Sequence, residues 1–237
     1  MTAKQQPRRW VDEIIDVLNE LGGQAHLNEI YDHVKKRGIM NISKTYEATI
    51  RRTIETHSSD SDSFYGNDDL FYSVHGKGSG FWGLRNILSN QEIQLFKRNI
   101  SHIQEQELES LIQNASDEDI NRTLSNFDHS GSIELKQTFQ KIRKVSQKTV
   151  QYLKEIYSYS CQICGVNHQH PYGVNVVEAH HIEYFSISLN HQPSNIVILC
   201  PTHHRLVHAG KAIFDRDKKV FRYINGFEEP LKINKHL

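Results

Sequence analysis

The stretch that decides the fold reads VNVVEAHHI at residues 174–182, NIVILC at 195–200 and PTHHRLVHAG at 201–210. The first two segments are rich in β-branched apolar residues, which predicts two short strands. The third begins with proline, a residue favoured in the first turn of a helix. The two strands and the helix would gather five polar side chains in one region: His180, His181, Asn195, His204 and His208. Five such groups in one strand-strand-helix unit predict a site that carries chemistry.

Two pairs of metal-binding residues bracket this unit. Cys161 and Cys164 are separated by two residues, as are Cys200 and His203. Each spacing allows one tight turn to present two donors to a tetrahedral zinc ion. A zinc ion with four protein ligands has no open position for substrate, so we expect a structural ion that holds a small region together. Two other histidines are alternative fourth ligands: His168 and His170.

The composition is that of an ordinary globular protein. The chain has 237 residues, of which 37% are hydrophobic and 24% are charged, which excludes a disordered tail or a peptide scaffold. It has no apolar run long enough for a membrane span, and the basic start at residues 1–9 leads into an acidic helical pattern rather than a signal-peptide core. Three cysteines cannot form a closed set of disulfides. We therefore expect a cytoplasmic protein that binds no membrane.

The first 86 residues predict three helices followed by a β-hairpin. Ser43 is a plausible N-cap of the third helix, and a glycine-rich turn carries Lys77 at the tip of the hairpin. Apolar periodicity and end signals place helices at residues 10–21, 27–37 and 44–57 and strands at 70–74 and 81–84.

This order of elements resembles a winged helix-turn-helix domain. The resemblance implies that the third helix enters the major groove of DNA and that the hairpin tip touches the backbone. The DNA-binding residues it implies are Lys44, Thr45, Ala48, Arg51, Arg52 and Lys77. The alternative is a solvated, charged helix face on an ordinary small domain.

Residues 87–158 predict a helical connector. Gly131 is the one glycine or proline in the whole segment, and apolar periodicity predicts a long helix over residues 133–157. This connector would act as a rigid spacer or as a dimer interface, with the two alternatives about equally supported.

Charge is distributed unevenly, although the formal net charge is zero. Residues 86–130 carry 3 basic and 8 acidic side chains, whereas residues 131–160 carry 6 basic and 2 acidic ones. Nine of the 15 histidines lie in the last 77 residues, where bound metal ions would add positive charge. A neutral total therefore does not exclude a nucleic acid partner, although it predicts modest non-specific affinity.

The strings AHHI, NIVILC and CPTHHRLVHAG, bracketed by the two ligand pairs, resemble the HNH nuclease family with its ββα-metal fold. The resemblance covers residues 161–210. It implies that His180 and His204 bind a catalytic divalent cation, with His208 as a third ligand found in the colicin-like branch. His181 corresponds to the general base, and Asn195 to the residue that orients its imidazole.

Elementary chemistry agrees with these implied roles. Hydrolysis of a phosphodiester needs an activated water, a sink for developing charge and help for the leaving oxygen. A neutral histidine can take the proton of water at physiological pH if a neighbour fixes its tautomer. The catalytic ion could be Mg²⁺, Mn²⁺ or Ni²⁺, because a site rich in histidine ligands also binds softer ions. Basic residues that could hold phosphate are Arg205, Lys141, Arg143, Lys144 and Lys148.

We therefore expect an α+β protein with three parts: a winged-helix DNA-binding domain at residues 1–86, a helical connector at 87–158 and a zinc-stapled HNH domain at 159–237. The architecture resembles restriction enzymes that depend on 5-methylcytosine, acting as homodimers on double-stranded DNA. One alternative is a restriction or mobile-element nuclease for unmodified sites. Another is a non-catalytic, zinc-containing DNA-binding regulator.

Overall fold

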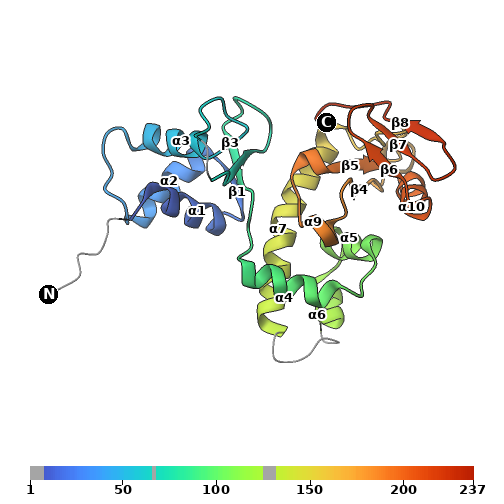
Figure 1. The fold of residues 1–237 in the computed structure, drawn as a ribbon, viewed down its shortest axis with the longest axis horizontal. Coiled ribbons are helices and arrows are strands. Elements are labelled where there is room, and N and C mark those ends of the chain that lie inside the picture. The colour runs from blue at the N-terminus through green and yellow to red at the C-terminus, as the bar shows by residue number, and fades with distance from the viewer. Residues whose placement is uncertain (1–7, 66–67, 125–131) are drawn as a thin grey trace. The chain divides into compact units, whose positions relative to one another are not determined.

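The computed structural model describes residues 8–65, 68–124 and 132–237. Residues 1–7, on which part of the signal-peptide argument rests, and Gly131 lie outside these ranges. The chain forms two compact units, Met1–Ser89 and Asn90–Leu237, each of which is considered by itself (Figure 1). The helices expected in a connector thus belong to the same unit as the predicted chemical site. In the described part of the chain, no helix is long and apolar enough to cross a bilayer.

In residues 8–65 and 68–89, the first unit combines three helices with a three-stranded antiparallel sheet of order β1-β3-β2. Ala25 pairs with Trp82 in this sheet, and Tyr72 pairs with Gly83. Buried apolar residues of all three helices, among them Ile14, form one core with the sheet. The elements are α1 (Trp10–Glu20), β1 (Gln24–His26), α2 (Leu27–Arg37), α3 (Tyr46–Thr56), β2 (Phe71–Ser73) and β3 (Phe81–Leu84).

The ends of α2 and α3 follow local chemistry. A capping box between His26 and Glu29 begins α2, and Gly38 ends it in the left-handed conformation that glycine adopts readily. The prediction that Ser43 caps the third helix is wrong. The Ser43 hydroxyl instead accepts a hydrogen bond from the backbone N–H of Thr45, 3.3 Å away, and this local turn delays the helix to Tyr46.

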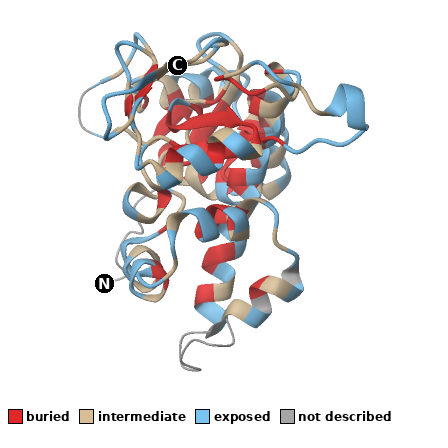
Figure 2. Ribbon diagram, turned by 90° about the vertical axis from the view of Figure 1, so that its right-hand side faces the viewer, coloured by how far each residue is buried: buried red, intermediate tan, exposed pale blue. Residues whose placement is uncertain are grey.

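The described residues of the second unit begin with four helices. Helix α7 spans 25 residues, and buried and exposed residues alternate along it (Figure 2). Its buried residues include Phe139 and Leu153, and the helix packs against α4, α5, α6 and the strand β5. The helices are α4 (Asn90–Ile100), α5 (Glu105–Gln113), α6 (Asp117–Leu124) and α7 (Ser132–Ile156).

The predicted strand-strand-helix unit is present, with shorter strands than the sequence suggested. Strands β4 (Glu178–His181) and β5 (Ile196–Leu199) pair antiparallel, with His181 opposite Ile196. Helix α10 (Pro201–Ala209) packs against both strands. The short elements between these strands are α9 (Phe185–Ser188) and η1 (Pro193–Asn195), while α8 (Gln169–Tyr172) precedes β4.

A small antiparallel sheet completes the second unit, and the sequence did not predict it. Its strands are β6 (Ile213–Asp215), β7 (Val220–Arg222) and β8 (Glu228–Pro230). Phe214 and Phe221 of this sheet share one core with Cys161, Cys200 and apolar residues of β5 and α10. The core therefore joins two of the predicted zinc ligands to α10, which carries His204 and His208.

Candidate functional site

The four predicted zinc ligands lie together at one end of β5. Cys161 and Cys164 follow α7, whereas Cys200 and His203 lie at the start of α10. Their donor atoms all lie within 4.8 Å of one another. The Nδ1 atom of His203 is 3.2 Å from the Cys200 sulfur and 3.6 Å from the Cys161 sulfur. The cluster includes neither of the alternative fourth ligands, His168 and His170.

The donor set of this cluster fits a zinc ion. Burial raises the pKa of the Cys161 thiol to about 12, so a bound cation would be needed to hold the thiolate form at neutral pH. The Nε2 atom of His203 lies 3.3 Å from Glu229. That carboxylate also accepts a hydrogen bond of 2.8 Å from the Tyr223 hydroxyl. Such an outer partner fixes the ring so that Nδ1 faces the sulfur atoms.

A second cluster joins the three predicted catalytic-metal histidines to a residue that the sequence argument missed. His180 lies on β4, and His204 and His208 lie one turn apart on α10. Ring nitrogens of these residues and a carboxylate oxygen of Glu109, from α5, all lie within 4.8 Å of one another. The Nδ1 atom of His180 is 3.2 Å from Nε2 of His208. Three imidazoles and one carboxylate form a donor set that suits a divalent transition-metal ion.

Glu109 connects this cluster to the predicted general base. Its Oε2 atom lies 3.0 Å from Nε2 of His204 and 2.9 Å from Nε2 of His208. Its Oε1 atom accepts the backbone N–H of His181 at 2.7 Å and lies 2.9 Å from the Nδ1 atom of that ring. Burial opposes ionisation of Glu109, but its contacts with His181, His204 and His208 prevail and hold its pKa well below the usual value.

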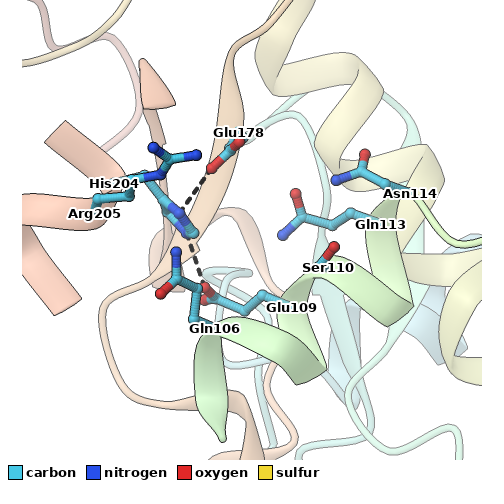
Figure 3. Close-up of a pocket in the computed structure, with 8 residues that line it drawn as sticks. All are labelled: Gln106, Glu109, Ser110, Gln113, Asn114, Glu178, His204 and Arg205. Atoms are coloured by element: carbon cyan, nitrogen blue, oxygen red, sulfur yellow. Dashed lines mark hydrogen bonds and ion pairs between the residues drawn. The ribbon is translucent and has the colours of Figure 1, made fainter. Parts of the chain in front are cut away.

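The histidines of the cluster differ in protonation because their surroundings differ. Burial lowers the pKa of His180 to about 3, so its ring is neutral and can offer a lone pair to a cation. Burial also lowers the pKa of His204, but contacts with Glu109 and Glu178 outweigh this effect and raise the pKa to about 9. Figure 3 shows these two carboxylates on either side of the His204 ring, with Glu178 2.7 Å from Nδ1. A cation bound at Nε2 would take the place of the positive charge that a proton supplies there.

The His181 ring is fully buried. Its Nδ1 atom contacts Glu109, which belongs to the second cluster, and its Nε2 atom lies 3.4 Å from Nδ1 of His191. We expected Asn195 to orient this imidazole, but the structure places the Asn195 amide against the loop that follows β4. It accepts a hydrogen bond from the backbone N–H of Glu183 and donates to the carbonyls of Glu183 and Asn190. Asn195 therefore fixes the loop, while Glu109 and His191 contact the ring.

A pocket leads to the cluster between α5, β4 and α10 (Figure 3). Arg205 is exposed at this pocket, next to His204 in the chain. A phosphate that approached the cluster through the pocket would meet the guanidinium group, and the role of Arg205 in holding phosphate stays a prediction. The residues that line the pocket are Gln106, Glu109, Ser110, Gln113, Asn114, Glu178, His204 and Arg205.

The remaining predicted DNA contacts lie in the first unit. Ala48, Arg51 and Arg52 are exposed on α3, away from the buried Ile50. Three others lie outside regular elements: Lys44 and Thr45 just before α3, and Lys77 in the turn between β2 and β3.

Two of these basic residues have partners within their own unit. Lys77 forms an ion pair of 2.5 Å with Asp62. Arg51 donates a long hydrogen bond of 3.5 Å to the Tyr31 hydroxyl.

Two of the basic candidates on α7 also have partners. Lys141 pairs with Glu92 of α4. Arg143 donates to the carbonyl of Ala115. These side chains tie the helices of the second unit together, which limits their availability to phosphate.

Residues 161–215 match the model of the HNH endonuclease family. The matched segment contains both ligand pairs, the paired histidines of β4, Asn195 and the histidines of α10. The match supports a nuclease, and an HNH nuclease domain implies DNA as the substrate. Glu109 lies outside the matched segment. Comparisons with curated proteins and with solved structures find no match for the chain.

Proposed function

We propose that the protein is a DNA endonuclease that hydrolyses phosphodiester bonds with one divalent cation. His180, His204 and His208 would hold this ion, and His181 would act as the general base. The observation that supports the proposal most is that these four histidines, all within the segment that matches the HNH endonuclease family, gather around the carboxylate of Glu109.

The residues of the site divide the work of hydrolysis. A divalent cation bound by the three histidines would polarise the scissile phosphate and stabilise the leaving oxygen. His181 would accept the proton of water as the general base. Its Nδ1 atom contacts the Glu109 carboxylate and its Nε2 atom lies 3.4 Å from Nδ1 of His191, so the reacting water would replace one of these contacts. Arg205 at the pocket would bind the incoming phosphate. The products would carry 5′-phosphate and 3′-hydroxyl ends.

We also propose that the first unit supplies DNA affinity as a winged-helix domain. The order of its elements and the exposed Arg51 and Arg52 of α3 support this role of the first unit. We further propose that the protein is a cytoplasmic restriction enzyme that cuts DNA at sites containing 5-methylcytosine and acts as a homodimer. Two HNH centres would cut both strands of a symmetric site, since each centre cuts one strand.

Incubation of the purified protein with methylated and unmethylated plasmid tests the proposal. Each plasmid is supplied with Mg²⁺, Mn²⁺ or Ni²⁺ in separate reactions. Cleavage of either plasmid with any of these ions supports nuclease activity. Faster cleavage of the methylated copy supports a restriction enzyme that depends on 5-methylcytosine. Intact plasmid in every reaction, despite DNA binding, would favour the non-catalytic regulator instead.

A further inference from the structure

One polar face of helix α5 fixes the helix against β4 and α9. Its residues Glu105, Glu109 and Gln113 are spaced by four and therefore share one side of the helix. Gln113 donates to the carbonyl of Ala179 at 2.7 Å and accepts its N–H at 3.1 Å, so it pairs with β4 much as a neighbouring strand would. Glu105 accepts the backbone N–H groups of Phe185 and Ser186 at the start of α9. These contacts at both ends of α5 hold Glu109 in place between them.

The Glu109 carboxylate reaches the histidine nitrogens at separations that suit ligands of one ion. Its Oε2 atom lies 2.9 to 3.9 Å from the three ring nitrogens of His180, His204 and His208. Two donors that are each about 2.1 Å from a shared ion, at right angles, lie roughly 3 Å apart. The backbone N–H of His181 fixes the other oxygen, in the way that carboxylate ligands are held by outer hydrogen bonds.

We propose that Glu109 is a fourth protein ligand of the catalytic cation, supplied by α5 from outside the segment that matches the HNH family. The inference deepens the proposed nuclease function and rests on it. An ionised carboxylate lowers the charge of the loaded site by one unit and leaves it positive toward a phosphodiester. It also adds a hard oxygen donor to three imidazoles, which favours Mn²⁺ or Mg²⁺ more than it favours Ni²⁺.

Direct measurement of cation binding tests this assignment without any DNA. Full-length, zinc-loaded protein is titrated with Mn²⁺ and separately with Ni²⁺ by isothermal calorimetry, with the bound Mn²⁺ also followed by electron paramagnetic resonance. In Glu109→Gln we expect Mn²⁺ affinity to fall by about 100-fold, since even the loss of an outer hydrogen bond to a ligand costs 10- to 100-fold. We expect a smaller loss for Ni²⁺, because imidazole alone suits that ion.

Glu105→Gln is the matched control. It removes the charge of a carboxylate on the same helix that also accepts backbone N–H groups. Glu105 is grouped with Glu109 and His181 but not with His180, His204 and His208, so it lies outside the proposed ligand set. We expect Mn²⁺ affinity like that of the wild type. An equal loss in both variants would overturn the assignment, because it would trace the effect to the docking of α5. Unchanged zinc content and melting temperature in Glu109→Gln exclude unfolding as the cause.

The same titrations separate the failure of this inference from the failure of the nuclease proposal. Glu109→Gln protein that binds Mn²⁺ as tightly as the wild type overturns the ligand assignment. If that variant also cuts DNA faster than the wild type, Glu109 blocks the site instead of binding the ion. Wild-type protein that binds one Mn²⁺ through Glu109 but cuts no DNA supports the ligand and contradicts the nuclease. Wild-type protein that binds neither ion overturns both.

Discussion

Substitution of one zinc ligand should unfold the HNH domain, and Cys200→Ser is the sharpest choice. Cys200 is buried at the junction of β5 and α10, and it shares a core with Phe214 and Phe221 of the last sheet. Zinc binding to small sites contributes about 10–16 kcal/mol of apparent free energy. A whole domain is stable by only about 5–15 kcal/mol. Loss of the ion would therefore remove a contribution as large as the entire stability of the domain.

The assay combines zinc content with thermal unfolding followed by near-ultraviolet circular dichroism. We expect one zinc ion per wild-type chain, none in Cys200→Ser, and loss of the tertiary signal of the second unit together with DNA cleavage. His168→Ala is the matched control, because His168 lies outside the four-ligand cluster and should keep the ion. A Cys200→Ser protein with the wild-type melting temperature and cleavage rate would show that the zinc ion does not hold the domain together.

Three further predictions follow from the packing and from the proposed DNA contacts. Gln113→Ala should lower the free energy of unfolding by about 2 kcal/mol, because it leaves the N–H and carbonyl of buried Ala179 without partners; an unchanged midpoint in urea would contradict this. Arg51→Ala combined with Arg52→Ala should weaken DNA binding and reduce its log-log salt dependence by roughly one for each lost phosphate contact; an unchanged slope would remove α3 from the interface. Plasmid carrying 5-methylcytosine should be cut faster than its unmethylated copy in a time course, and equal rates would leave a nuclease for unmodified sites.

Local spacing made much of the site predictable from the sequence. The pairs Cys161 with Cys164 and Cys200 with His203 each lie within one turn, so their ligand geometry depends on a few residues. His204 and His208 likewise share a helix face through a separation of four. In both cases the information that places the side chains lies within the segment itself, and the structure brings these residues together.

Glu109 could not be predicted by the same reasoning. It precedes His181 by 72 residues, and its contacts arise from the docking of α5 on β4. A signal was present, because Glu105, Glu109 and Gln113 place a polar stripe on a helix that also carries buried apolar residues. Such a stripe on an isolated helix indicates a solvated face, and only tertiary structure shows that Glu109 is buried.

Short elements limited the prediction of the fold. Strand β1 and the strands β6, β7 and β8 have three residues each, too few to show the alternation that marks a strand. The start of α3 was placed two residues early because Ser43 has the side chain of a typical N-cap, yet forms a turn with Thr45. Longer periodic segments such as α7 were predicted to within one residue at each end.

Single-turnover cleavage of plasmid DNA by His181→Ala decides whether His181 is the general base. The assay uses Mn²⁺ at a concentration that saturates the site, because the His181 ring also contacts Glu109. We expect a rate lower by about 100-fold or more, the usual contribution of a general base, with unchanged zinc content and DNA affinity. Cleavage at the wild-type rate by a His181→Ala protein that binds both ions and DNA normally would contradict the assignment of His181 as the base.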